Sequence, residues 1–122
     1  MKFILSMTAL AVLASSLLAS KAESTPTTVS SSQYQQTMRA VCFYFKSNCT
    51  EAMKIVKCET GGSYSPWSAN GQYLGIFQMG SQERRNYGHG NNVWAQAKAA
   101  YAYFKDAGWH PWLDYEPPGC AS

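Results

Sequence analysis

The segment TEAMKIVKCETGG, Thr50–Gly62, decides how the folded part of this chain is arranged. Thr50 is a good N-cap residue and the pair Gly61-Gly62 stops a helix, so the segment predicts a helix with Glu59 in its last turn. The positions expected to face inward are Ile55, Val56 and Cys58. The unpaired carbonyl groups at a helix end disfavour a negative charge, and this position therefore favours the protonated form of Glu59.

Another helix is predicted upstream, from about Gln33 to Lys46. Its apolar residues recur at i, i+3, i+4 and i+7, a spacing that places them on one stripe of a helix. The residues of the stripe are Met38, Val41, Cys42 and Phe45. The pattern breaks at residues 47–49, so the two helices are joined by a short connection.

Turn-forming and β-prone residues follow the second helix. The stretch Gly61–Gln72 is rich in Gly, Ser, Asn and Pro and is expected to form a loop. The apolar, β-prone stretch Tyr73–Met79 is expected to form a short strand or hairpin. The chain is therefore predicted to be mainly α (α+β), with one small β element.

Two more helical segments are predicted before the C-terminal tail. Ser81 is expected to cap a short helical turn that runs through Arg85, and Asn91 or Asn92 to cap a longer helix. Gly108 ends that longer helix. One face of it carries Val93, Ala97, Ala100, Tyr101 and Phe104.

The first 22 residues of the chain predict export. The 122 residues leave room for one domain. Residues 1–22 contain Lys2, then the apolar run Phe3–Leu18, then small residues that suit cleavage after Ala19 or Ala22, which is the pattern of a secretory signal peptide. The apolar run falls short of the roughly 20 residues that span a bilayer. Residues 23–32 predict a polar linker, and residues 33–122 the folded domain.

The charge balance argues against nucleic acid as a partner. Loss of Lys2 and Lys21 with the signal peptide lowers the formal net charge from +3 to +1. Nucleic-acid-binding domains concentrate many more Lys and Arg residues on one face. We expect a monomer that is secreted to the extracellular space or cell wall, with no membrane anchor after signal cleavage.

Four cysteines in an exported chain predict two disulfides, with three possible connectivities. A zinc site is the competing interpretation. It is not favoured, because the chain has no CxxC pair and only His89 and His110 to complete a ligand set. We therefore expect neither a metal nor a cofactor. A bond from Cys120 to the body of the domain would hold the aromatic tail that begins at Trp109.

Glycosidic bond cleavage needs a proton donor, usually one of two carboxylates. Of the seven acidic residues, Glu23 lies in the linker, Glu51 in a first helical turn, and Glu83 beside Arg84 and Arg85 as a surface group would. Glu59 differs because it leads into a loop and strand that could form the opposite wall of a cleft. Without further information, a solvated Glu at a helix end remains the simpler interpretation.

Three motifs resemble one family. They are Cys58-Glu59-Thr60-Gly61-Gly62, the run Asn70–Met79 (NGQYLGIFQM), and Gly108-Trp109-His110-Pro111-Trp112. In this order they look like the resuscitation-promoting-factor and soluble lytic transglycosylase branch of the lysozyme-like superfamily, over roughly Ala40 to Cys120. The resemblance implies a lysozyme-like domain in which Glu59 is the catalytic acid and Gly75-Ile76-Phe77-Gln78 lines a glycan cleft.

The resemblance also implies a disulfide pairing. Resuscitation-promoting factors carry a bonded cysteine before the catalytic Glu and another after the terminal Trp pair. Cys58 and Cys120 stand in those places, which leaves Cys42 to pair with Cys49. The segment Gly80–Gly90 departs from the family, since it is longer and more polar than expected. Within it, His89 either hydrogen-bonds substrate or is a solvated loop residue.

The candidate substrate-binding residues come from the same motifs. Aromatic residues stack on the apolar faces of sugar rings, and amides hydrogen-bond to their substituents. The candidates are Asn70, Gln72, Tyr73, Gln78, Trp109 and Trp112. Core packing is the alternative role for the two Trp residues, and pinning of the loop is the alternative for Gln78.

The expected partner is a peptidoglycan glycan strand. With Glu59 as the lone carboxylate, the expected product is a 1,6-anhydro sugar, as in a lytic transglycosylase. A hydrolase instead needs a second carboxylate, for which Asp106, Asp114 and Glu116 are the available donors. Two other interpretations stay open, a non-catalytic module that binds cell-wall glycan and a secreted effector without a glycan role.

Overall fold

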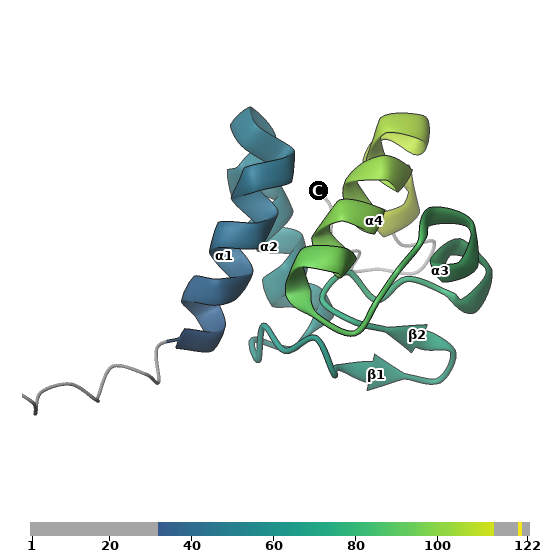
Figure 1. Cartoon of the computed structure of the whole chain (residues 1–122), viewed down its shortest axis with the longest axis horizontal. Helices are drawn as coiled ribbons and strands as arrows, with labels where there is room; N and C mark the ends of the chain where they lie inside the picture. Colours follow the sequence, from purple (N-terminus) through teal and green to yellow (C-terminus); the bar gives the residue numbers. More distant parts are fainter. Residues whose placement is uncertain (1–31, 114–119, 121–122) are drawn as a thin grey trace, which may run out of the picture. The chain divides into compact units, whose positions relative to one another are not determined.

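The computed structural model describes residues 32–113 and residue 120, and Figure 1 shows one small hairpin at the edge of a group of helices. The predicted signal peptide, nearly all of the predicted linker, Asp114 and Glu116 lie outside the described residues. The elements are α1 Ser32–Phe45, η3 Lys46–Asn48, α2 Cys49–Glu59, β1 Ala69–Asn70, β2 Tyr73–Leu74, α3 Ser81–Tyr87, α4 Val93–Ala107 and η4 His110–Trp112. The prediction of a mainly helical fold with a short β element is confirmed.

Helix α1 packs against both α2 and α4, as the apolar stripe predicts. Val41 and Phe45 of that stripe are buried, while Met38 and Cys42 are partly buried at its edge. The observed start and end each lie one residue before the predicted ones. Thr37 is also buried, because its hydroxyl donates to the carbonyl of Tyr64 at 2.9 Å.

Helix α2 begins at Cys49, so the prediction of Thr50 as its N-cap is wrong. The 3-10 turn η3 runs directly into the helix, and the backbone N–H of Cys49 already donates to the carbonyl of Lys46. Asn48 occupies the cap position without a side-chain hydrogen bond. Ile55 and Val56 face the core as predicted, whereas Cys58 is exposed because it bonds outward to Cys120.

The β element is a two-stranded antiparallel hairpin. Asn70 pairs with Tyr73 and Ala69 with Leu74, so the first strand comes from the stretch that was predicted as loop. The second strand stops at Leu74, and the chain returns in a tight turn that closes with a bridge between Leu74 and Met79. This turn carries Ile76 and Phe77 into the core, where both are fully buried.

Helices α3 and α4 complete the fold. Gly80 is the N-cap of α3, so Ser81 lies inside the helix and does not cap it as predicted. Asn92 caps α4 as predicted, because its side-chain oxygen accepts from the N–H of Ala95 at 2.9 Å. Gly108 ends the helix with a φ of 62°, a left-handed conformation that suits glycine.

The core is aromatic and centres on Phe45. Its ring contacts four others, at centroid distances of 5.2 to 5.7 Å, from the turn, from α4 and from the tail. These four are Phe77, Tyr101, Phe104 and Trp109. One residue of α1 therefore joins segments that lie far apart in the sequence.

Two disulfides close the domain, Cys42 with Cys49 and Cys58 with Cys120, and the predicted pairing is confirmed. All four cysteines are paired, so none is available as a zinc ligand. Disulfides are typical of proteins in oxidising, extracytoplasmic compartments. No helix in the described part of the chain is long and apolar enough to cross a membrane.

Candidate active site

A cavity of about 310 Å³ lies where the end of α2, the hairpin and the C-terminal turn meet. Its lining consists of Glu59, Asn70, Tyr73, Gln78, Pro111, Trp112 and Leu113. Five of the seven residues named from the sequence as catalytic or substrate-binding are therefore brought together. Among the described residues of the lining, Glu59 is the one carboxylate.

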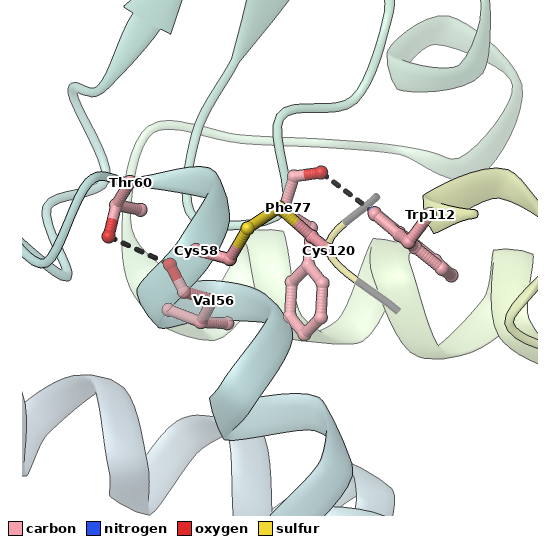
Figure 2. The surroundings of a disulfide bond; sticks show 6 residues. All are labelled: Val56, Cys58, Thr60, Phe77, Trp112 and Cys120. Carbon is pink, nitrogen blue, oxygen red and sulfur yellow. Dashed lines mark hydrogen bonds between the residues drawn. A yellow bond between two sulfur atoms is a disulfide. The ribbon is translucent and has the colours of Figure 1, made fainter. Parts of the chain in front are cut away.

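Glu59 is the last residue of α2, and the hydrogen bonds of Thr60 fix the point at which the helix ends. The Thr60 hydroxyl donates to the carbonyl of Val56 at 2.8 Å (Figure 2) and accepts from the N–H of Tyr64 at 2.9 Å. Gly61 and Gly62 then take positive φ values of 62° and 87°, which turn the chain away from the cavity. Glu59 itself is partly buried, beside the disulfide from Cys58.

Asn70 and Tyr73 are directly paired in the hairpin, so their side chains leave it close together. Gly71, with a φ of 63°, makes the tight turn between them. The Tyr73 side chain is 46% exposed, so a ligand in the cavity can contact its ring. These two residues form the wall opposite Glu59 that the sequence predicts.

Gln78 pins the loop. Its side-chain N–H₂ donates to the carbonyl of Ser68 at 2.8 Å and to that of Gly75 at 2.9 Å. Both N–H donors of the Gln78 amide are used within the protein, so this side chain offers a ligand in the cavity an acceptor oxygen and no free donor. Of the predicted cleft segment 75–78 only Gln78 reaches the lining, because Ile76 and Phe77 are buried in the core.

The two Trp residues of the tail have different positions. Trp112 is only 3% exposed, yet it lines the cavity, and its indole N–H donates to the carbonyl of Phe77 at 2.9 Å (Figure 2). Trp109 instead stacks in the core, with its ring centroid 4.1 Å from that of Phe104, and is absent from the lining. Core packing is therefore the role that the structure supports for Trp109.

Sequence reasoning missed Pro111 and Leu113, which line the cavity on either side of Trp112. The signal available in the sequence was that both residues are direct neighbours of Trp112, which was a predicted candidate. Gln72, in contrast, lies outside the lining, and its backbone carbonyl accepts from the guanidinium of Arg84 at 2.6 Å.

His89 has neither of its predicted roles. It lines none of the cavities described here, and its Nε2 is enclosed with no hydrogen-bond partner among the described residues. Burial, together with the charge of Arg84, lowers the pKa of His89 to about 4. The residue is therefore a partly buried, neutral imidazole packed under the turn at Gly75.

Carboxylates other than Glu59 lie outside this cavity in the described part of the chain. Asp106 is exposed on α4 and accepts a hydrogen bond from the Tyr87 hydroxyl at 2.8 Å. That hydrogen bond raises the pKa of Tyr87. Asp114 and Glu116 are not described by the structure, so Asp106 is the one predicted second acid that can be placed, and it is not in the cavity.

A somewhat larger cavity of about 330 Å³ lies between α1 and α2. Tyr34, Met53 and the Cys42–Cys49 sulfurs contribute to its lining, with Lys54 and Lys57 at its edge. The described lining contains neither a carboxylate nor a histidine. It therefore offers no group suited to proton transfer near neutral pH, and the Glu59 cavity is the better candidate for chemistry.

No protein-family model, curated protein or solved structure that was compared with this chain matches it. The function must therefore be inferred from the residues of the cavity and from the resemblance that its motifs carry.

Proposed function

We propose that this chain is a muralytic enzyme that cleaves the β-1,4 bond between N-acetylmuramic acid and N-acetylglucosamine in peptidoglycan, with Glu59 as general acid and base. The observation that carries the proposal is the meeting of Glu59 with Asn70, Tyr73 and Trp112 in one cavity. These are the residues that the resemblance associates with catalysis and glycan contact. Two disulfides suit an enzyme that works outside the cytoplasm.

The proposed reaction needs one carboxyl group. Protonated Glu59 donates its proton to the glycosidic oxygen as the bond from C1 of the muramic acid to that oxygen breaks. The resulting carboxylate then takes the proton of the C6 hydroxyl, and O6 bonds to C1. The products are a 1,6-anhydromuramic acid end and a free 4-hydroxyl on the glucosamine unit, and Glu59 is protonated again.

Lytic transglycosylation is preferred to hydrolysis because of the composition of the cavity. Hydrolysis with two carboxyl groups requires a second one about 5 to 9.5 Å from the first. The described lining of the Glu59 cavity supplies no second carboxylate, whereas intramolecular attack by O6 requires neither a second acid nor a bound water. This supports the anhydro product.

The test is mass spectrometry of fragments released from purified peptidoglycan by the mature protein and by Glu59→Gln. We expect anhydro-muropeptides from the parent and a rate roughly 10²- to 10⁴-fold lower for the variant, the usual loss when a general acid is removed. Glu51→Gln is the matched control, because Glu51 pairs with Lys54 at 3.9 Å on α2 and lines none of the described cavities.

Other products would contradict parts of the proposal. Reducing-end muropeptides would identify a hydrolase and overturn the transglycosylase assignment. If the parent releases nothing but binds cell wall, and binding survives Glu59→Ala, the chain is a non-catalytic glycan-binding module. If it neither releases fragments nor binds, it has no glycan role.

A further inference from the structure

A second cavity, of about 280 Å³, adjoins the Glu59 cavity. Both are lined by Tyr73, Gln78, Pro111 and Trp112, so these four residues form the boundary between two chambers of one cleft. The second chamber extends toward α3 and α4, whose residues Glu83, Tyr103 and Ala107 line it. A chain that occupies the first chamber can therefore continue into the second.

Glu83 is the one carboxylate in the described lining of the second chamber. It is partly exposed at the surface, next to Arg84 and Arg85 in the sequence, and forms an ion pair with neither. The Arg84 guanidinium instead donates to the carbonyls of Gln72 and Met79, both at 2.6 Å. Within the described part of the chain, the Glu83 carboxylate has neither a hydrogen bond nor an ion pair.

Gly80 sets the position of this carboxylate. A methyl group added to Gly80 would lie 2.6 Å from the Glu83 Oε1 and 3.6 Å from the Tyr73 ring. The Glu83 carboxylate therefore lies close to the backbone of Gly80. The ring of Tyr73, which lines both chambers, lies on the same side. A side chain at position 80 would displace it.

The surroundings of Glu83 suit a cation. Tyr73, Tyr103 and Trp112 supply aromatic walls, and the described lining of the chamber contains no Lys or Arg, its one basic side chain being the imidazole of His110. Together with Glu59, Glu83 makes the cleft acidic in a chain whose formal net charge is +3. A carboxylate in a chamber lined by aromatic rings attracts an ammonium group by charge, and the rings attract it by cation–π interaction.

We infer that the second chamber is a subsite for a primary ammonium group carried by the glycan strand, and that Glu83 determines specificity for it. The inference rests on the proposed function for the identity of the strand. Two sources share this chemistry, the 2-amino group of a de-N-acetylated hexosamine and the side-chain amine of a diamino acid in the stem peptide. A fully acetylated, peptide-free strand offers neither.

Equilibrium binding to Glu59→Gln tests the inference without requiring turnover. The probes are β-1,4-linked glucosamine oligomers and N-acetylglucosamine oligomers of equal length, titrated by calorimetry at low salt and at a mildly acidic pH, where the 2-amino groups are protonated. The charged oligomer is expected to bind roughly five- to tenfold more tightly, the range of a partly buried ion pair with aromatic contacts. The preference should shrink as salt screens the pair.

Two further changes locate the effect. Adding Glu83→Gln to the Glu59→Gln protein should remove the preference and leave affinity for the acetylated oligomer unchanged, whereas adding Glu51→Gln removes an equal charge elsewhere and should preserve it. Gly80→Ala keeps the Glu83 carboxylate but displaces it. Because the φ of Gly80 is an ordinary −70°, this change adds no backbone strain, and it should also weaken the preference.

Acetylated strands that retain their stem peptides distinguish the two sources of the amine. Tighter binding of these strands than of stripped ones, abolished by Glu83→Gln, assigns the subsite to the peptide amine. A preference for glucosamine oligomers alone assigns it to the sugar. Equal affinity for all probes, or a preference that survives Glu83→Gln, overturns the inference.

The outcomes of this test are separate from those of the proposed function. If the parent cleaves nothing but Glu59→Gln shows the Glu83-dependent preference, the subsite stands and the enzyme proposal fails. If the parent cleaves peptidoglycan and Glu83→Gln lowers the rate on every substrate as much as Glu59→Gln does, Glu83 acts in the chemistry. That result would overturn its role in specificity.

Discussion

Glu59 combines two properties at the level of the single residue. It is the last residue of α2, where the carbonyl groups have no hydrogen-bond partner within the helix, and its side chain is partly buried in a cavity. A general acid must lie within reach of the bond that it protonates, and this position gives a ligand in the cavity access to the Glu59 side chain.

The Gln96 side chain forms hydrogen bonds to three backbone groups around the turn. Its oxygen accepts from the N–H of Ile76 at 2.9 Å, and its N–H₂ donates to the carbonyls of Pro66 and Gly90 at 3.1 and 2.9 Å. The side chain is 1% exposed, so water cannot replace these bonds. Gln96 therefore holds three loop segments against α4.

Gln96→Leu is expected to lower the free energy of unfolding by roughly 2 to 4 kcal/mol. The apolar side chain leaves the buried N–H of Ile76 and the part-buried carbonyls of Pro66 and Gly90 without their partner, and an unsatisfied buried group costs about 1 to 3 kcal/mol. Urea unfolding followed by Trp fluorescence measures the change. Gln35→Leu, at an exposed position of α1, is the control, and a loss for Gln96→Leu no greater than for the control would contradict the account.

The turn between β2 and α3 is the element that joins the site to the core. Gly75 has a φ of 92°, and a methyl group added there would lie 2.6 Å from the Gln96 side-chain oxygen and 2.8 Å from His89 Nε2. The backbone of the turn thus packs directly on these two side chains. A substitution of Gln96 or His89 is therefore expected to shift the turn and, with it, Gln78, which lines the cavity.

Stability should depend on pH through His89. Its pKa is about 4 in the folded protein and about 6.5 in an unfolded chain, so the unfolded state binds the proton first as the pH falls. The free energy of unfolding contributed by neutral His89 is therefore complete above about pH 6.5 and is lost progressively down to about pH 4.

Urea unfolding of the parent and of His89→Gln at pH 7, 6, 5 and 4 tests this dependence. Other groups titrate in both proteins, so the difference between the two curves isolates His89. The parent is expected to lose more stability than the variant between pH 6.5 and 4. Parallel curves across that interval would show that the imidazole is not held neutral by its surroundings.

At the scale of the whole molecule, the Cys58–Cys120 disulfide connects helix α2 to a segment beyond η4, across a sequence separation of 62 residues. Loop-closure entropy predicts a contribution of roughly 4 kcal/mol from this bond, and roughly 2 kcal/mol from Cys42–Cys49, whose separation is 7. The longer bond also stands next to Glu59.

Replacing Cys58 and Cys120 together by Ser is therefore expected to cost about 4 kcal/mol of unfolding free energy and to lower peptidoglycan cleavage. The paired replacement of Cys42 and Cys49 should cost less and leave cleavage near the parent rate, because that bond joins α1 to the far end of α2. Urea unfolding and fragment release measure the two effects. An equal loss of cleavage in both variants would show that the Cys58–Cys120 bond has no special role in placing Glu59.

The helices were predictable from the sequence because their determinants are local. The apolar stripe of α1, the Asn92 cap of α4 and the stop after Glu59 depend on residues within one or two helical turns. The bounds of α1 were correct to one residue for this reason. The disulfide pairing followed from the resemblance of the motifs and not from the spacing of the cysteines.

Only the tertiary structure decided how residues of one type divide between core and cavity. Trp109 and Trp112 are three positions apart in one motif, but Trp112 reaches the cavity because the carbonyl of Phe77, 35 residues away, accepts its N–H. Gln96 was missed because its hydrogen bonds arise where loops meet a helix that is distant in sequence. Local pattern encodes which face of a helix is apolar, whereas the partner of each polar group is set by packing.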